Sequence, residues 1–134
     1  MKRILLMSAA AMASAALSAQ TVKTMSDLKP EQKSMAISLK LTGRLSAEPK
    51  GDYRQMRDLC FQVRTIDLGD AQSTEIPKNA FHSRHQLENI VLPKALKTIG
   101  TQAFFACDKL QAVTIPASVD TIGAAAFSLS LIHI

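Results

Sequence analysis

The stretch from Leu87 to Phe127, LENIVLPKALKTIGTQAFFACDKLQAVTIPASVDTIGAAAF, contains one pattern written twice. A leucine, a short apolar run, a proline, the tripeptide TIG and the pair AF all recur at one fixed interval, as from Pro93 to Pro116. Generic apolar positions can match by chance, but proline, glycine and phenylalanine at fixed offsets are not expected to. A period of this length, about 23 residues, predicts a stack of structural repeats.

The pattern also extends toward the N-terminus. Phe81 precedes Phe104 by the same interval, and further upstream the interval is longer by one, as from Ile66 to Ile90. The additional residue falls within the polar stretch 69–75, GDAQSTE, where a surface loop can absorb it. One unit cannot bury its apolar edge alone, so neighbouring units must stack. We therefore expect a solenoid of about three coils, since each unit spans about 23 residues.

Within each unit the apolar residues follow the period of a β-strand. In ENIVLP, Ile90 and Leu92 alternate with Asn89 and Val91, so one face of a short strand points inward. Pro93 ends the strand because proline cannot donate a hydrogen bond to the ladder. The inward positions are expected to stack as the structural repeat: Ile66, Leu68, Phe81, Leu87, Ile90, Leu92, Ile99, Phe104, Leu110, Val113, Ile115, Ile122 and Phe127.

In the second half of each unit the chain is expected to turn and run back across the coil. Gly100 and Gly123 suit bends that need a positive φ, although Pro77 holds the equivalent place in the first unit. The segments 78–84, KNAFHSR, and 101–107, TQAFFAC, are predicted to form short helical turns. Their phenylalanines, Phe81, Phe104 and Phe127, are expected to stack as an internal aromatic column.

A family resemblance rests on the segments IPKNAF, LPKALKTIGTQAFFACDKL and IPASVDTIGAAAF. They resemble the BspA-type leucine-rich repeats of bacterial surface proteins, and the likeness covers residues 63–127. The resemblance implies a leucine-rich-repeat solenoid of short parallel β-strands with turns and short helical segments. It also implies an exported, surface-associated protein used for protein binding or adhesion. That family brings no catalytic residues to carry over, so we expect no enzyme.

Residues 1–19 have the layout of a secretory signal peptide. Lys2 and Arg3 precede an Ala-rich apolar run to Leu17, and the small residues Ser18 and Ala19 follow. The run is too short to span a bilayer comfortably, so the mature chain is expected to contain no transmembrane span. We predict export, to the cell surface, the extracellular space or the periplasm, with cleavage after Ser18 or Ala19.

Residues 20–62 are interpreted as a lead-in and N-terminal cap of the solenoid. Residues 20–34 are polar and predicted to be loose, whereas 37–41 alternate like a strand, with Ile37, Leu39 and Leu41 inward. Asp52 is a candidate N-cap of a following helix that places Tyr53, Met56 and Leu59 on one face. This strand and helix would shield the first coil.

The end of the chain, 128–134 with the sequence SLSLIHI, does not continue the repeat register. We interpret it as an out-of-register tail left by truncation. The chain could then be a structural spacer, or a fragment of a larger protein whose functional domain, an enzyme included, follows.

Cys60 and Cys107 occupy the same position of the repeat, two coils apart, with Arg84 in that position between them. Stacked strands lie about 4.8 Å apart, so the two Cα atoms should be about 10 Å apart, beyond the roughly 7 Å that a disulfide allows. We expect no disulfide, but two free thiols that are at least partly buried.

Other chemistry finds little support in the sequence. His82 and His85 have a spacing that a metal could use, but no third ligand is close in sequence. No nucleophile elbow or phosphate loop is present, so no metal, cofactor or catalytic residue is expected. Removing Lys2 and Arg3 leaves 14 basic and 11 acidic residues, scattered without an aromatic-rich basic stripe, which argues against nucleic-acid binding.

The outward positions of the strands form the remaining candidate site. In a solenoid these positions align into a shared face, which is where repeat proteins bind partners. We expect a protein ligand on a host or neighbouring cell to bind there. The predicted binding residues are Arg64, Thr65, Asp67, Glu88, Asn89, Val91, Gln111 and Thr114, with Ala112 between the last two.

Overall fold

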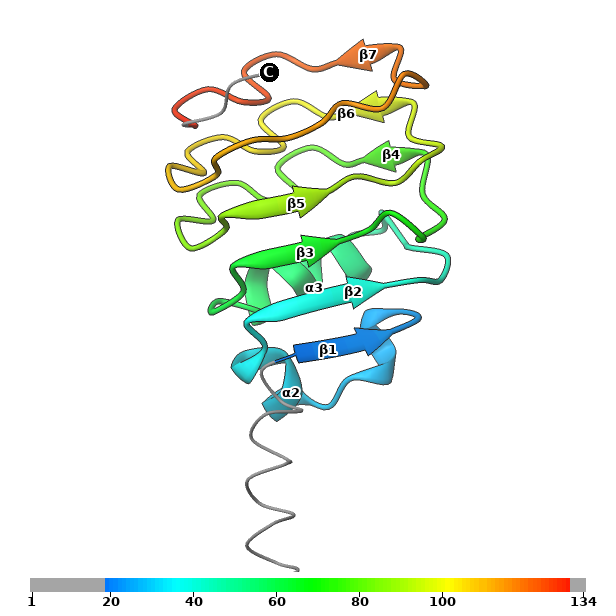
Figure 1. Ribbon diagram of the computed structural model, residues 1–134, viewed down its shortest axis with the longest axis vertical. Helices are drawn as coiled ribbons and strands as arrows, with labels where there is room; N and C mark the ends of the chain where they lie inside the picture. Colours follow the sequence, from blue (N-terminus) through cyan, green and yellow to red (C-terminus); the bar gives the residue numbers. More distant parts are fainter. Residues whose placement is uncertain (1–18, 131–134) are drawn as a thin grey trace, which may run out of the picture.

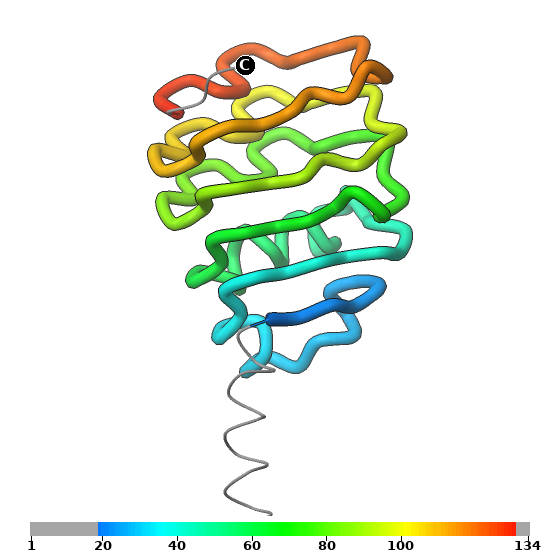
Figure 2. The backbone as a smooth tube through the Cα atoms, viewed as in Figure 1, coloured from blue at the N-terminus to red at the C-terminus, as the bar shows by residue number. Residues whose placement is uncertain are grey.

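The computed structural model describes residues 19–130, which wind into coils stacked along one axis (Figure 1, Figure 2). The chain runs from β1 at one end of the stack to β7 at the other (Figure 1). The elements in order are β1 (Ala19–Val22), η1 (Met25–Asp27), α2 (Pro30–Met35), β2 (Ser38–Leu41), α3 (Asp52–Leu59), β3 (Thr65–Asp67), β4 (Glu75–Ile76), β5 (Asn89–Val91), β6 (Thr98–Ile99) and β7 (Thr121–Ile122).

Two parallel sheets run along the stack. The first has the strand order β1-β2-β3-β5, and the second has the order β4-β6-β7. Ile66 of β3 lies opposite Ile90 of β5, and Ile76 of β4 lies opposite Ile99 of β6. The strands thus pair at the two intervals seen in the sequence. This arrangement confirms the predicted solenoid of short parallel strands.

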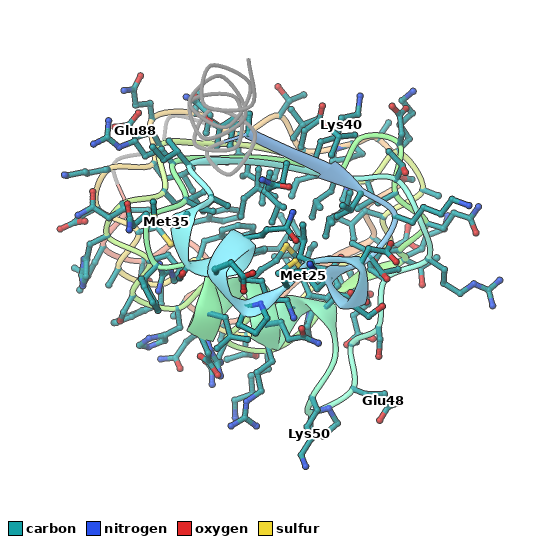
Figure 3. The ribbon with its side chains drawn as sticks, turned by 90° about the horizontal axis from the view of Figure 1, so that it is seen from below. Met25, Met35, Lys40, Glu48, Lys50 and Glu88 are labelled. Carbon is teal, nitrogen blue, oxygen red and sulfur yellow. The ribbon has the colours of Figure 1, made fainter. Side chains whose placement is uncertain are left out.

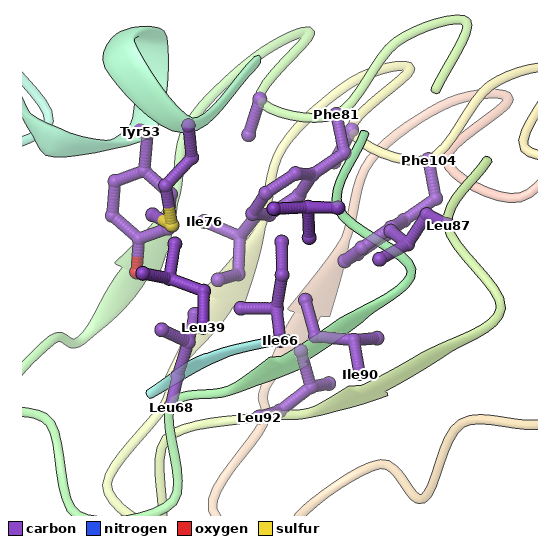
Figure 4. Close-up of a cluster of buried hydrophobic side chains, with 14 of the residues drawn as sticks. Leu39, Tyr53, Ile66, Leu68, Ile76, Phe81, Leu87, Ile90, Leu92 and Phe104 are labelled. Carbon is purple, nitrogen blue, oxygen red and sulfur yellow. The ribbon is translucent and has the colours of Figure 1, made fainter. Parts of the chain in front are cut away.

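The core is a set of columns along the stack, and the aromatic column is among them (Figure 4). The rings of Phe81 and Phe104 stack with centroids 5.3 Å apart, and those of Phe104 and Phe127 with centroids 5.2 Å apart. Tyr53 of α3 closes the column by meeting Phe81 edge-on at 6.1 Å. The predicted repeat positions from Ile66 to Val113 are buried, which explains why each coil needs a neighbour.

The outermost coil departs from that expectation. Ile122 is 48% exposed, although its position in the repeat is inward. Ile115 and Phe127 are only partly buried against the core. Within the described residues, β7 is the edge of its sheet, so these side chains are covered from one side only.

The predicted helical turns at 78–84 and 101–107 are wrong. Both segments consist of consecutive turns instead, with left-handed residues such as Asn79 and Ser83, both at φ 59°. The cause is an alternation of hydrogen bonds. The Phe81 amide donates to Ala103 O of the next coil at 2.7 Å, and the neighbouring His82 amide closes a local turn on Asn79 O. A helix would direct every amide along its own axis.

The expected positive φ at the glycines is also wrong, because none of the described glycines has one. Glycine is required at these positions because a side chain would not fit between the two coils. A Cβ on Gly100 would lie 2.5 Å from Lys78 N and 2.7 Å from Pro77 C, in the coil before it. A Cβ on Gly123 would likewise meet the backbone of Thr101.

The same geometry explains Pro77. Gly100 donates its amide to Ile76 O, and Gly123 donates to Ile99 O, both at 2.7 Å. Each of these amides therefore bonds to the preceding strand of the second sheet. β4 is the first strand of that sheet. Proline at position 77 loses no ladder hydrogen bond there, as is usual for proline in edge strands.

The N-terminal end is closed by ordered structure, so the prediction that residues 20–34 are loose is wrong. They form part of β1, then η1 and most of α2. Met25 is fully buried and lies near the middle of the cross-section (Figure 3). Ala36, just after α2, is also fully buried. These residues shield the first coil where a repeat array needs a cap.

The strand and helix expected in the cap are present, with three corrections. The N-cap of α3 is Gly51, and Asp52 is the first helical residue. Ile37 is 41% exposed and Leu59 is 43% exposed, so neither belongs to the buried face. The reason for Ile37 is that β2 begins only at Ser38.

Asp52 joins the parts of the cap to one another. This carboxylate is nearly buried and accepts hydrogen bonds from Met25 N at 2.7 Å and from Ser46 N at 2.8 Å. One side chain therefore holds η1 and the loop before α3 in place.

Candidate functional site

The outward positions of the first sheet form one surface, which we call the front face: Arg64, Thr65, Asp67, Glu88, Asn89, Val91, Gln111, Ala112 and Thr114. Thr65 lies opposite Asn89, and Asp67 lies opposite Val91. A single bridge continues the row from Asn89 to Ala112. Neighbouring strands of a sheet are about 4.8 Å apart, so successive residues within a row are close neighbours. The structure thus brings residues far apart in sequence together at the register that the repeat predicts.

Exposure differs among the residues of the front face. Arg64, Asn89, Val91, Gln111, Ala112 and Thr114 are exposed, and Thr65, Asp67 and Glu88 are half-buried. Val91 is a large apolar side chain that is 52% exposed near the middle of these rows. Val91 and its uncharged neighbours Thr65, Asn89 and Ala112 resemble the composition of interface cores, which are depleted in charge, although Asp67 lies directly opposite Val91.

Charged residues border this centre on one side. Lys40 of β2 approaches Asp67 at 3.9 Å and Asp70 at 3.3 Å. Lys94 reaches Asp70 at 3.5 Å. The hydrogen bond and charge of Lys40, with the charge of Lys94, hold the pKa of Asp70 below its usual value. Lys40 and Asp67 are half-buried and Asp70 and Lys94 are exposed, so these ion pairs contribute little to the stability of the fold.

Sequence reasoning missed Lys40, Asp70 and Lys94 as parts of this surface. Lys40 precedes Asp67 by an interval longer than the repeat, so the repeat period does not relate them. Asp70 lies in the inserted loop, where the period also fails. The sequence did contain one usable signal. Lys40 lies at an outward position of the predicted strand 37–41, so it could have been placed beside the outward residues of the next strand.

A groove of about 670 Å³ lies beside this charged border. The loops that follow the strands of the first sheet line it, with apolar Leu45, Ala71 and Ala95 and with charged groups that include Arg44 and Glu75. Asp70 and Lys94 belong both to the groove and to the charged border. The front face and the groove are therefore continuous, and a protein partner could contact both.

The two cysteines are buried and lack the properties of a reactive site. Cys60 and Cys107 are free and fully buried, and Cys107 Sγ donates to Phe81 O at 3.0 Å. Burial raises the pKa of each thiol to about 11, so both stay protonated near neutral pH, whereas reactive cysteines need a lowered pKa.

Arg84, which takes the same place in the coil between the cysteines, reaches toward α3. Its guanidinium donates to Arg57 O at 2.8 Å and to Cys60 O at 3.1 Å. These carbonyls lie at the C-terminal end of α3, where a positive charge is favourable.

The two histidines of the HSRH segment have separate partners. His82 stacks on Phe105 with ring centroids 4.9 Å apart, and its Nδ1 lies 2.8 Å from Ser83 Oγ. His85 Nδ1 lies 3.1 Å from a carboxylate oxygen of Asp108. Across residues 19–130, no group of three or more His, Cys, Asp or Glu residues is placed to hold a metal ion.

A family match agrees with this geometry. A family model described as a BspA type leucine rich repeat region (6 copies) matches residues 56–133, more than half of the chain. No protein with a curated description matches the chain. Among solved structures, a leucine-rich repeat protein from Bacteroides ovatus ATCC 8483 is similar at 17% sequence identity and a TM-score of 0.40.

That comparison covers 71% of this chain and 33% of the other, so this chain spans about a third of the length of the Bacteroides protein. The repeats of the matched family are associated with protein–protein interaction, are typically non-enzymatic, and are commonly surface-associated. On the extent of the family match and on the stacked coils that carry it, the chain belongs to the BspA-type leucine-rich repeat family.

Proposed function

We propose that this chain is an exported repeat protein that binds a protein on a host or neighbouring cell through its front face, and so mediates adhesion at the bacterial cell surface. The observation that carries the proposal is the alignment of Asn89, Val91 and their row partners into one surface, which is exposed or half-buried throughout and has Asp67 as its only charged member. Repeat proteins use such extended faces to bind partners.

The first sheet supports binding better than the second. Its strands β1 and β2 have four residues each, whereas β4, β6 and β7 have two each. Lys40 and Glu88 lie along the same side of the cross-section, opposite Glu48 and Lys50 (Figure 3). The first sheet therefore offers a longer and broader surface, with the groove at its border.

Export rests on the signal-peptide pattern of residues 1–19 and on the common surface association of the family. Residues 1–18 lie outside the described part of the chain, and β1 begins at Ala19. Cleavage after Ser18 would leave β1 whole, whereas cleavage after Ala19 would remove its first residue. In the described residues, no helix combines the length and apolar character that crossing a membrane requires.

The test compares matched double variants of the leaderless chain 19–134. Asn89→Arg with Val91→Glu changes the front face, and Thr98→Arg with Thr121→Glu makes the same charge changes on the second sheet. Binding of each labelled protein to intact target cells is measured before and after the cells are stripped of surface protein by trypsin. We expect the front-face variant to bind at least about tenfold more weakly, because a few central residues dominate most interfaces.

The control variant should bind like the unchanged protein, and trypsin treatment should abolish binding. Equal binding by both variants would reject the front face, and so would alanine changes at Asp67, Asn89 and Thr114 that leave binding intact. Binding that survives trypsin would reject a protein ligand.

A second candidate is a structural spacer that carries a functional domain of a larger protein. It is favoured by the partly uncovered last coil, in which Ile122 and Leu129 are exposed. The spacer proposal predicts that front-face substitutions leave adhesion unchanged while changes in coil number alter it.

A further inference from the structure

In the described part of the chain, β4 has one edge that no other strand covers. Strands β6 and β7 each pair with the preceding strand of the second sheet (Figure 1), but β4 is the first strand of that sheet. The coil before it has the helix α3 between its strand β2 and the next strand β3. Within residues 19–130, the amides of Thr74 and Glu75 donate to no acceptor in that preceding coil.

The following coils show what the equivalent amides bind. Lys97 N and Thr98 N share the carbonyl oxygen of Thr74, at 2.8 and 3.2 Å. One coil further, Asp120 N and Thr121 N share the carbonyl oxygen of Lys97, at 2.8 and 3.3 Å. One carbonyl of a parallel neighbouring segment therefore satisfies such a pair of amides. The pair on β4 needs one carbonyl from a segment laid along its open edge.

The groove of about 670 Å³ lies at this edge of β4. Residues 73–75 line it on the side of β4, and Arg44, Leu45 and Ala47 line it from the preceding coil. Its volume is within the range of about 300–1,000 Å³ that is usual for ligand sites. Small side chains such as Ala47 and Ala95 leave room for a larger apolar group. A segment along β4 can therefore place an apolar side chain near Leu45 while its backbone meets the open amides.

Two charged residues of the groove remain available to a partner. Arg44 lies opposite Gln72, three residues before Glu75. Arg44 and Glu75 are both exposed, and neither forms an ion pair within the described residues. Asp70 and Lys94 also line the groove, but they pair with each other at 3.5 Å. A segment parallel to β4 would therefore pass Arg44 first and Glu75 later.

We propose that the groove binds one extended segment of a protein partner, parallel to β4, with an acidic, an apolar and a basic residue at alternate positions in that order. The segment gives one carbonyl to Thr74 N and Glu75 N. Alternate side chains of an extended segment lie on one face, so the three meet Arg44, Leu45 and Glu75 in turn. Strand addition of this kind gains affinity from main-chain hydrogen bonds and specificity from side-chain sites. The inference rests on the proposed function only in taking the partner to be a protein.

The test measures the binding of two fluorescent peptides to the full chain, acetyl-Asp-Thr-Leu-Thr-Lys-amide and acetyl-Lys-Thr-Leu-Thr-Asp-amide. We expect the first peptide to bind at least about fivefold more tightly, because both of its charges meet their opposites. The preference should reverse in the variant Arg44→Glu with Glu75→Arg. The matched control, Arg64→Glu with Glu88→Arg, makes the same exchange of charge on the front face and should keep the original preference.

Amide NMR spectra of the full chain give a second readout, in which the first peptide should shift the resonances of Thr74 and Glu75 until they saturate. A preference that the charge exchange leaves unchanged would overturn the inference, and so would the lack of saturable binding by either peptide. Shifts of the same two amides that grow with the concentration of the chain alone would also overturn it, because a second copy would then occupy the groove. No cells are used, so failure of the groove is distinguishable from failure of the front face in the cell-binding test.

Discussion

Gly100 and Gly123 lie where the backbone of one coil rests on the backbone of the coil before it. No side chain fits there, because even one added carbon at Gly100 would fall 2.5 Å from Lys78 N. The contact is with backbone, which cannot rotate away as the end of a flexible side chain can. The glycine of the TIG tripeptide therefore sets how closely successive coils approach.

Gly100→Ala should lower the free energy of unfolding by about 1–3 kcal/mol, the usual cost of overpacking a closely packed site. Gly69→Ala is the matched control, because its added carbon would meet only side-chain atoms of Asp67 and Val91, at 3.2 and 3.3 Å. Urea denaturation measures both variants. A Gly100 variant as stable as the Gly69 variant would contradict the close approach of the coils.

The buried hydroxyl and thiol groups make the stability depend on alkaline pH. Burial raises the pKa of Cys60 and Cys107 from 9.0 to about 11, and burial is the main reason that the pKa of Tyr53 rises from 10.0 to about 12. Each group is neutral when protonated, so the folded state holds its protons at a pH where the unfolded state has released them. The stability that these three groups contribute is therefore complete below about pH 9, and it is lost as the pH rises from about 9 to 12.

We expect the free energy of unfolding to decrease between pH 9 and 11 less steeply in the double variant Cys60→Ala with Cys107→Ala than in the unchanged protein. Titration with a thiol reagent gives a second measurement, in which the native thiols should react slowly and both should react after unfolding. Identical pH slopes for the two proteins would show that the thiols are not protected in the folded state.

At the scale of elements, the cap depends on one carboxylate that receives two backbone amides. Asp52 begins α3 and also accepts from Met25 N and Ser46 N, so it connects η1, a loop and a helix. An amide in its place keeps the shape but turns one acceptor into a donor, which would then face a backbone amide.

Asp52→Asn should therefore lower the free energy of unfolding by about 1–3 kcal/mol, the cost of a buried polar group without a partner. Asp120→Asn is the control, because Asp120 is exposed and its side chain takes part in no hydrogen bond or ion pair within the described residues. The measurement is the melting temperature of each variant, compared with that of the unchanged protein. Equal melting temperatures would mean that the cap does not depend on this carboxylate.

The elements also show how far the sequence alone could lead. The pairing of Ile66 with Ile90 and the stacking of Phe81, Phe104 and Phe127 were predicted, because a fixed period places equivalent side chains one above another. The front-face rows follow from the same period. A period says nothing of where the backbone amides go, however. The turns at 78–84 and 101–107 were therefore mistaken for helices.

The cap was harder to predict because it lies outside the period. Residues 20–34 look polar, yet Met25 is fully buried there, because η1 closes the end of the stack. Lys40 joins the charged border through Asp70, a contact that needs the relative placement of β2 and a loop. Such contacts depend on tertiary structure, which neither composition nor local pattern specifies.

At the scale of the whole molecule, the two ends of the stack differ. The N-terminal end is covered by β1, η1 and α2, which bury Met25, Leu28 and Ala36. In the part of the chain from 19 to 130, the C-terminal end shows exposed Ile122 and Leu129. Because each coil contacts only its neighbours, stability should depend strongly on the cap at the closed end.

The last prediction concerns that cap. Deleting residues 19–36 from the leaderless chain 19–134 would uncover the core around Leu39, Tyr53 and Met56, all buried now, and would leave Asp52 without its bond to Met25. Each large apolar side chain that loses burial costs about 1.5–3 kcal/mol, a large share of the roughly 5–15 kcal/mol typical of a domain. We expect chain 37–134 to be unfolded or aggregated at a temperature where chain 19–134 is folded, as measured by circular dichroism and sedimentation. If the two chains unfold at the same temperature, the first strand and its helices are an addition to the solenoid and do not form its cap.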